Sequence, residues 1–353
     1  MPQSLSCDAA HPLAVRGFGG KPCCLIASSG LRSRRCDKTS MMRTLLRQRL
    51  LRGAGRLNEP AKLEKLHMTG SNEWRHPTPD LYITERGSGS TTLIVIHGGP
   101  DWDHSYIEPY VTPLQDMCRV LSFDMRGCGR SGRAQSPEGY HVDYVVDDLV
   151  VLMDARGISH GVLLGFSFGG RVALRFLQRH PERVKALILA STTAYQDFQP
   201  ELDAWEERRE RYGACREKAD RITASPTLSA AEKARALAFD CLPLDVYDLS
   251  HIEPIKTALS AVRFSGEWTK RWLGGHRISP DDVDYETVIK LSGVPCLIIH
   301  GAKDMRFPVA VAERLHRTLP HSRLVILEQT GHLAHMEAPE RWLLPVREFI
   351  DGL

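Results

Sequence analysis

Residues 162–170 read Val162-Leu163-Leu164-Gly165-Phe166-Ser167-Phe168-Gly169-Gly170, and a stretch with helical character, residues 171–178, follows them. A serine between glycines after an apolar run is the pattern of a nucleophile elbow, a tight strand-to-helix turn that exposes the hydroxyl. Glycine is expected at 165 and 169 because this turn packs the backbones of the strand and the helix closely together. A Gly/Ser-rich strand-to-helix connection without chemistry has the same pattern, so the motif alone leaves the function open.

Candidate partners for this serine lie further along the chain. An activated serine needs a histidine that accepts its proton and an acid that orients the histidine. The apolar run 294–299 predicts a buried strand, and Asp304 lies in the loop after it. Residues 324–327 predict the next strand, and His332 lies in the loop after that one. The chain order Ser167, Asp304, His332 is the order found in α/β-hydrolases, and it differs from the orders in chymotrypsin and subtilisin.

A second glycine pair indicates where an oxyanion would be held. The strand-like run 93–96 is followed by His97-Gly98-Gly99-Pro100, where glycines allow backbone amides to approach a ligand. In this arrangement one donor is the amide after the nucleophile, here Phe168, and the other comes from this loop. We assign the second donor to Gly99, with Gly98 as the alternative, because Pro100 has no N–H.

Other residues compete for these roles. Asp124 follows a predicted strand at 120–123, but the turn after it is expected to be structural, so we favour Asp304 as the triad acid. His97 is expected to brace the glycine loop. His335 lies three residues after His332 and is expected at a helix start or a pocket rim. The neighbouring Asp101, Asp103 and His104 carry metal-capable side chains, yet three loop residues alone do not indicate a metal site.

The motifs in combination resemble those of the proline iminopeptidase family of α/β-hydrolases, over roughly residues 64 to 351. The matching stretches are residues 97–100 with His104 and Tyr106, residues 124–131, the Ser167 elbow, residues 301–304, and residues 331–332 with Glu337 and Pro339. The resemblance implies that Ser167, Asp304 and His332 form the triad, and that the protein releases N-terminal residues, often proline, from short peptides without a metal. Two positions depart from the family: Asp101 stands where a glycine is usual, and Phe168 where tryptophan is frequent.

The expected architecture is an α/β-hydrolase fold, a mostly parallel eight-stranded sheet flanked by helices with a helical cap insertion. We expect a basic leader at 1–58, the first part of the core at 59–191, the cap at 192–291 and the second part of the core at 292–353. Alternating or apolar runs predict strands, and residues 142–154 predict a helix before the elbow strand. The strand-like runs are 81–85, 93–96, 120–123, 162–164, 184–189, 294–299 and 324–327.

Substrate choice is expected to lie in the cap. In prolyl aminopeptidases acidic cap residues hold the free amino group, and Glu206, Glu207 and Glu210 are the candidates here, with Trp205 beside them. Acids mixed with arginines at three- and four-residue spacing also make a solvated helix face with internal ion pairs, and this reading is favoured. Other candidate substrate contacts are Gly98 and Phe166.

The charge distribution limits the kinds of partner that the protein is expected to bind. Residues 1–58 hold 11 basic and 2 acidic residues, net +9, whereas the remainder holds 35 basic and 41 acidic residues, net −6. A mildly acidic body gives no reason to expect nucleic-acid binding, and no apolar run is long enough for a membrane span. The leader has the composition of an organellar transit peptide, but a disordered or misassigned start, with Met41 or Met42 as the true beginning, is the preferred interpretation. We therefore expect a cytoplasmic protein, with an organelle as the alternative.

Nine cysteines, four of them in the leader, show no disulfide-scaffold or zinc-ligand spacing, so reduced thiols are expected. No cofactor and no metal are expected, and the only partner indicated is a small-molecule or short-peptide substrate. The sequence does not indicate an oligomeric state. The function predicted is a serine hydrolase that forms an acyl-enzyme and removes N-terminal residues of the proline type. The alternatives are a carboxylesterase or lactonase for small esters, or a non-catalytic ligand-binding protein of the same fold.

Overall fold

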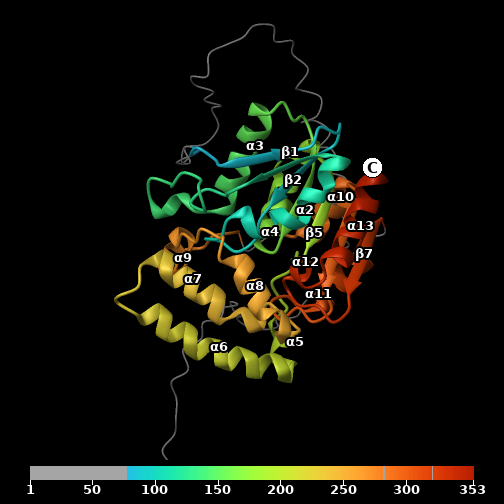
Figure 1. Ribbon diagram of the computed structural model, residues 1–353. Coiled ribbons are helices and arrows are strands. Elements are labelled where there is room, and N and C mark those ends of the chain that lie inside the picture. The colour runs from blue at the N-terminus through green and yellow to red at the C-terminus, as the bar shows by residue number, and fades with distance from the viewer. Residues whose placement is uncertain (1–77, 281–282, 320) are drawn as a thin grey trace, which may run out of the picture. The chain divides into compact units, whose positions relative to one another are not determined.

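The computed structural model describes residues 78–280, 283–319 and 321–353, and the predicted leader lies outside the described residues. Seven strands form one sheet in the order β1-β3-β2-β4-β5-β6-β7 (Figure 1). Strand β1 is antiparallel to β3, and all other neighbours are parallel. The strands are β1 (Ile83–Arg86), β2 (Thr92–Ile96), β3 (Arg119–Phe123), β4 (Gly161–Phe166), β5 (Val184–Ala190), β6 (Cys296–Gly301) and β7 (Ser322–Leu327).

Each of the seven strand-like runs in the sequence forms a strand, with ends that differ by at most two residues from those expected. The expectation of eight strands is not met within the described residues, where seven are present. The eighth was implied by the resemblance alone and corresponds to no strand-like run in the sequence. The long apolar runs of the central strands follow from burial on both faces, which parallel sheets require.

Helices cover both faces of the sheet. Alternate residues of one strand point to opposite sides: in β2, Ile94 and Ile96 pack in one apolar cluster, and Leu93 and Val95 in the other. The first cluster includes helices α3 (Val142–Ala155), α4 (Phe168–Arg179), α10 (Tyr285–Ser292) and α11 (Val309–Thr318), and the second includes α2 (Glu108–Val111), α12 (Ala334–Glu337) and α13 (Pro339–Asp351).

Apolar spacing explains these helices. In α3, buried side chains recur three, four and seven residues apart, as one face of a helix requires, at Val142, Val145, Val146, Leu149, Leu152 and Met153. The helix predicted at 142–154 is thus confirmed, and the elbow helix begins directly after Ser167.

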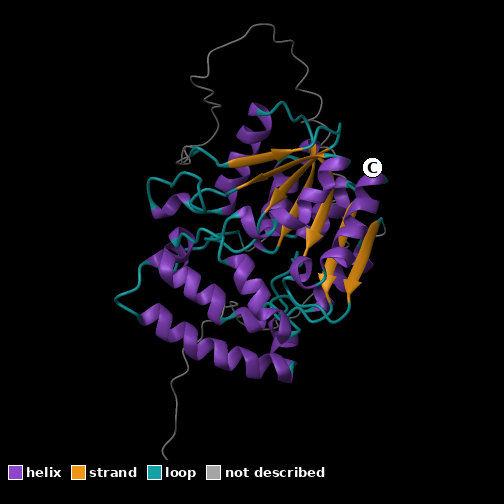
Figure 2. Cartoon of the chain, viewed as in Figure 1, coloured by secondary structure: helices purple, strands orange, loops and turns teal. Residues whose placement is uncertain are grey.

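Between β5 and β6 the described residues form helices and loops, without a strand. We call the chain between β5 and α10 the cap; its α-helices are α5 (Gln199–Ala204), α6 (Glu206–Ala224), α7 (Ala230–Asp240), α8 (Ile252–Leu259) and α9 (Glu267–Leu273). The arrowheads of the central parallel strands point towards these helices (Figure 2). The cap therefore lies at the carboxyl ends of the strands, where α/β folds place their ligands. Helix α10 packs against α4 instead, beside the sheet.

One expectation about the cysteines was wrong. Cys215 of α6 and Cys241, directly after α7, form a disulfide with a Cα–Cα distance of 5.0 Å. The pair was missed because 26 residues separate the cysteines, and only the packing of α6 against α7 brings them together. Disulfides are rare in reducing compartments, so this pair does not support reduced thiols throughout the chain. Cys118, Cys128 and Cys296 are buried and free.

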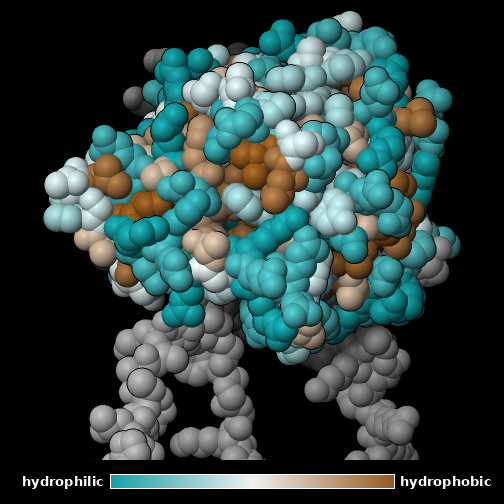
Figure 3. All heavy atoms as spheres, turned by 60° about the horizontal axis from the view of Figure 1, so that its bottom comes forward, coloured by the Kyte–Doolittle hydropathy of each residue, from teal (hydrophilic) through white to brown (hydrophobic). Residues whose placement is uncertain are grey.

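None of the helices in the described part of the chain is both long and apolar enough to span a membrane. Figure 3 shows one face, on which hydrophobic residues gather near the centre among largely hydrophilic ones.

A buried ion pair fastens the loop after β3 to α3. The Arg126 guanidinium donates to both oxygens of Asp148, at 2.6 and 2.5 Å, and to the Gly139 carbonyl at 3.2 Å. Both charged side chains are fully buried. A buried ion pair stabilises a fold little in comparison with apolar residues of similar volume. Loss of one partner, however, leaves an uncompensated buried charge and is strongly destabilising.

Arg126→Met is therefore expected to lower the free energy of unfolding by about 3 to 5 kcal/mol, measured by urea denaturation. Arg347→Met is the matched control, because Arg347 also binds an aspartate through two nitrogens, at 3.0 and 2.8 Å from Asp116, but at the surface. Its unfolding midpoint should change little. Equal losses in the two variants would contradict the importance of burial.

Candidate active site

Ser167 occupies the turn between β4 and α4 in a backbone conformation that side chains rarely adopt, with φ 53° and ψ −117°. The predicted reason for the flanking glycines is confirmed. A Cβ on Gly169 would lie 2.1 Å from the carbonyl oxygen of Ile96, and one on Gly165 would lie 2.5 Å from the Cα of Gly170. Backbone strain at a half-buried serine, maintained by the surrounding packing, is typical of functional sites.

His332 lies between Ser167 and Asp304. Its Nε2 is 3.0 Å from the Ser167 Oγ, and its Nδ1 is 2.8 Å from the Asp304 Oδ2. Phe166 and Phe307 pack near its ring, with centroids 5.3 and 5.6 Å away. These contacts hold the imidazole between a hydroxyl and a carboxylate, and this geometry suits proton transfer from serine.

Asp304 is completely buried. Burial alone would raise the pKa of its carboxyl, but His332, His300 and the hydrogen bond from the Phe307 amide together lower it. The other oxygen, Oδ1, accepts hydrogen bonds from the amides of Arg306 and Phe307 at 2.8 and 2.9 Å. The carboxylate is thus held ionised and aimed at His332.

Asp124, the competing acid, has other partners. It lies 2.6 Å from the Nδ1 of His104 and accepts the amide of Arg130 at 2.8 Å. It therefore fixes the loop after β3, as expected for a structural residue.

The glycine loop after β2 is braced by His97 and Tyr106. The Nδ1 of His97 lies 2.9 Å from the Gly98 carbonyl, and its Nε2 accepts the amide of Met125 at 3.0 Å. Since Nε2 is an acceptor, Nδ1 carries the proton and donates. Burial lowers the pKa of His97, which keeps the ring neutral in this role.

These contacts favour Gly99 over Gly98 as an oxyanion donor. The Gly98 amide donates to the Tyr106 hydroxyl at 2.8 Å and is therefore already engaged. The Gly98 carbonyl and the Gly99 N–H belong to one trans peptide unit and point in opposite directions. Because His97 holds that carbonyl, it also sets the direction of the Gly99 N–H. A Cβ on Gly98 would lie 2.8 Å from the Ser167 Cβ, so the loop runs directly against the serine.

Phe168, the other proposed donor, is the first residue of α4, whose first amides have no partner within the helix. Its ring packs against Trp268 of α9, with centroids 5.4 Å apart. Phe166 packs against His335 at 4.6 Å. The surroundings of the serine are therefore largely aromatic.

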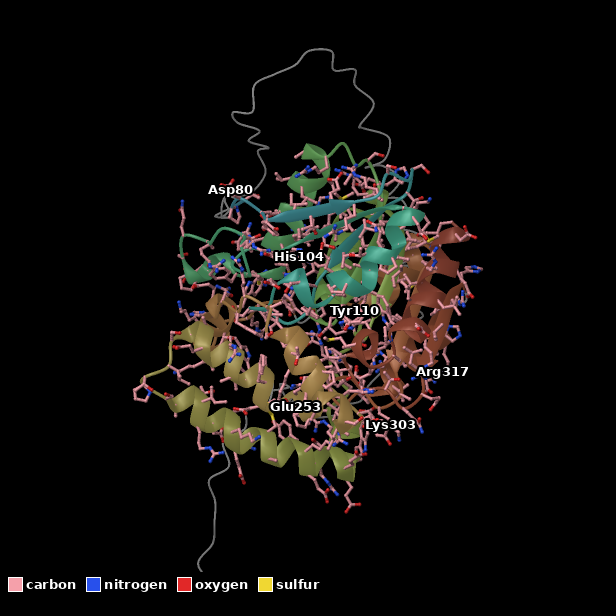
Figure 4. The ribbon with its side chains drawn as sticks, in the orientation of Figure 1. Asp80, His104, Tyr110, Glu253, Lys303 and Arg317 are labelled. Atoms are coloured by element: carbon pink, nitrogen blue, oxygen red, sulfur yellow. A yellow bond between two sulfur atoms is a disulfide. The ribbon has the colours of Figure 1, made fainter. Side chains whose placement is uncertain are left out.

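The candidate cap residues differ in exposure. Glu206 and Glu210 are exposed. Glu207 is part-buried and accepts a hydrogen bond from Arg211 at 2.6 Å. Lys303, beside the start of α6 in Figure 4, has its ammonium 6.0 Å from the ring centre of Trp205. These glutamates form the solvated and ion-paired helix face that was the favoured reading.

Asp101, Asp103 and His104 have separate partners. The two aspartates accept hydrogen bonds from the cap, Asp101 from residues 265–269 and Asp103 from the amide of Arg263, while His104 binds Asp124. Among the residues that the structure describes, no group of three or more His, Cys, Asp or Glu side chains is arranged to hold a metal ion.

Sequence reasoning gave Glu337 no role beyond its place in the family pattern. Its carboxylate accepts the amides of Gly331, at 2.6 Å, and of Tyr247 and Asp248, at 2.9 and 3.2 Å. Glu337 thus links two segments: the loop in which His332 lies and the cap. Its position within that pattern, six residues after Gly331, was the signal available.

His335 lies in α12, as expected of a helix-start residue, but it is fully buried and not at a rim. Neither ring nitrogen has a hydrogen-bond partner in the described structure. Burial, with a smaller effect of His332, lowers its pKa to about 3. The ring is therefore neutral and is surrounded by Tyr106, Tyr110, Phe166 and Trp342.

Comparison with known proteins gives several relatives. A model of the alpha/beta hydrolase fold family matches residues 91–339. A proline iminopeptidase of Clostridioides difficile is 24% identical over 280 residues, which cover 76% of this chain and 93% of that protein. A putative 2-succinyl-6-hydroxy-2,4-cyclohexadiene-1-carboxylate synthase of Bacillus subtilis is 27% identical over 290 residues, covering 82% and 99%. A solved thermophilic esterase from Thermogutta terrifontis has 26% identity and a TM-score of 0.59, covering 78% of this chain and 94% of its own.

His335→Leu is expected to make the fold less sensitive to acid. An unfolded histidine has a pKa of about 6.5, and the folded value is far lower. The unfolded state therefore binds more protons below about pH 6.5, and the wild type loses stability there by up to about 1.4 kcal/mol per pH unit. The free energy of unfolding is measured with urea at about pH 7.5 and about pH 5.5. The value for the variant, relative to that for the wild type, should be higher at about pH 5.5 than at about pH 7.5 by about 1.4 kcal/mol.

His160→Leu is the control, because His160 is exposed and its ring lies 3.0 Å from the Ser159 hydroxyl at the surface. It should show no such pH-dependent difference. A His335→Leu variant that loses stability in parallel with the wild type would refute the buried neutral histidine.

Proposed function

Because the chain belongs to the alpha/beta hydrolase fold family, we propose that it is a serine hydrolase that forms an acyl-enzyme on Ser167. The observation that carries the proposal is the continuous set of contacts from the Ser167 hydroxyl through His332 to Asp304. A ligand-binding protein of the same fold has no need of this arrangement together with glycines beside the serine.

In the first step the Ser167 Oγ attacks the substrate carbonyl carbon while the His332 Nε2 takes the hydroxyl proton. The carbonyl π electrons move to oxygen, and the amides of Gly99 and Phe168 donate hydrogen bonds to this oxyanion. Asp304 remains ionised and stabilises the imidazolium through Nδ1.

The tetrahedral intermediate then collapses, the bond to the leaving group breaks, and His332 returns the proton to that group. The acyl-enzyme remains. Water repeats the sequence: His332 takes its proton, the hydroxide adds to the acyl carbon, and Ser167 leaves with the proton from His332. Apart from the substrate and water, the steps use side chains and backbone groups of this chain.

For the substrate, we propose a small ester with an uncharged acyl group. Phe166, Phe168 and Phe307 surround the reacting groups with apolar surface. Binding of a free amino group requires a desolvated carboxylate, whereas Glu206 and Glu210 are exposed and Glu207 is neutralised by Arg211. Release of N-terminal residues is the second candidate, and it is favoured by the relatives named proline iminopeptidase.

Ser167→Ala is expected to remove turnover, by on the order of a millionfold in kcat, without changing the fold. A fluorophosphonate probe should modify the wild type at Ser167, identified by mass spectrometry of the peptide, and should leave the variant unmodified. Circular dichroism and thermal unfolding of the variant provide the control. Turnover retained in Ser167→Ala would exclude the proposed mechanism.

The substrate is tested with 4-nitrophenyl butyrate, prolyl arylamide and N-acetylprolyl arylamide on the same preparation. We expect turnover of the ester to exceed that of both amides, with no large effect of the acetyl block. An amine-binding site would instead lose roughly 10- to 1,000-fold on acetylation, because a buried carboxylate would be left unpaired. Such a loss, with fast turnover of the free prolyl substrate, would assign the protein to the aminopeptidases.

A further inference from the structure

Asp101 follows Pro100 in the loop that carries Gly99, and its side chain is completely buried. Its carboxylate accepts five hydrogen bonds, all from one short cap segment, residues 265–269. The donors are the Ser265 hydroxyl at 2.8 Å, the amides of Gly266, Trp268 and Thr269 at 2.7, 2.9 and 2.8 Å, and the Thr269 hydroxyl at 2.6 Å.

The main chain adds a sixth contact, from the Ser265 amide to the Asp101 carbonyl at 2.9 Å. A buried carboxylate is costly unless its oxygens are matched by donors, and here both oxygens are matched. The match requires the start of α9 to lie at one place relative to the loop. It also explains φ 78° at Asp101, a conformation that favours glycine and is maintained here by the cap contacts.

The position of Asp101 is transmitted to Gly99. The amide of Trp102 donates to the Gly99 carbonyl at 2.8 Å, which closes the turn around Asp101. The Trp102 ring lies directly against Gly99, since a Cβ on Gly99 would be 2.7 Å from it. The same ring packs against Phe264 of the cap, with ring centroids 5.5 Å apart. The 265–269 segment is therefore linked through Asp101 and Trp102 to Gly99, the residue whose N–H is the proposed oxyanion donor.

The second oxyanion donor contacts the same cap segment. The Phe168 ring packs edge-on against Trp268, and the Trp268 indole N–H donates to the Arg126 carbonyl at 2.8 Å. Thus residues 265–269 touch both parts of the proposed oxyanion hole, one through Asp101 and one through Trp268.

We propose that Asp101 is a positioning residue through which the cap sets the geometry of the oxyanion hole. This role rests on the proposed serine-hydrolase function. It predicts that weakening the contact between Asp101 and the cap impairs transition-state stabilisation more than substrate binding. A residue that only fastens the cap would alter stability, or KM, without affecting affinity for a tetrahedral mimic.

The test compares Asp101→Asn, Ser265→Ala and Thr269→Val with the wild type. Asparagine keeps the shape but presents an NH₂ group to donors that need an acceptor, and the two cap variants each remove one hydroxyl donor while Asp101 stays. Asp284→Asn is the matched control. Asp284 likewise accepts an amide and a hydroxyl from one threonine at a helix start, Thr287 at 3.0 and 2.6 Å, but it caps α10, which packs beside the sheet.

Readouts are kcat and KM on an ester that the wild type hydrolyses, the inhibition constant of an alkyl trifluoromethyl ketone, and thermal unfolding. We expect Asp101→Asn to lower kcat roughly 10- to 100-fold and to raise the inhibition constant of the ketone by a similar factor. KM should change less than about threefold. Ser265→Ala and Thr269→Val should give smaller losses of the same kind. Asp284→Asn should leave kcat and ketone affinity unchanged.

A folded Asp101→Asn enzyme with wild-type kcat and ketone affinity would overturn the role of Asp101. A loss confined to KM or to thermal stability would also overturn it. If Asp101→Asn does not fold, the two cap variants decide, because they leave Asp101 in place. Failure of the proposed function itself is distinguishable, since Ser167 of the wild type would then resist the fluorophosphonate.

Discussion

The close approach of the elbow after β4 to the end of β2 is the constraint on which the rest of the site depends. Gly169 lies against the carbonyl of Ile96, with no space for a side chain. Helix α4 therefore starts directly beside the strand that leads into the glycine loop, and Ser167 and Gly98 come into contact. The sheet backbone thus places the serine beside both proposed oxyanion donors, and buried side chains then fix the glycine loop.

Buried polar groups then fix the loops at this edge of the sheet, and each is matched by specific partners. His97 and Tyr106 hold the Gly98 carbonyl and amide, Asp304 holds His332, and Glu337 holds the loop before His332. Because an unmatched buried group is costly, each of these contacts admits few alternative loop positions. The cap takes part in this arrangement through Asp101 and Glu337, so it is more than a cover over the strands.

Much of the site was predictable because its signals are local. Ser167 is marked by glycines within two residues of it, and Asp304 and His332 each follow an apolar strand. Parallel strands bring such loops to one edge of the sheet. The role of Asp101 was not predictable, although its departure from the family pattern was visible, because its five donors lie more than 160 residues away in the chain. The disulfide was missed for the same reason, with 26 residues between its cysteines.

The sequence by itself determined the strands and the elbow, since these follow from apolar spacing and from the need for glycine at close backbone contacts. Tertiary structure alone decided the partners of two buried carboxylates: Asp124 meets His104, and Asp101 meets the cap. The pair of Glu207 and Arg211, four residues apart on one helix, was by contrast indicated by the sequence. The physical reason is that hydrogen bonds and ion pairs depend on distances of about 3 Å, and sequence patterns set such distances only between near neighbours.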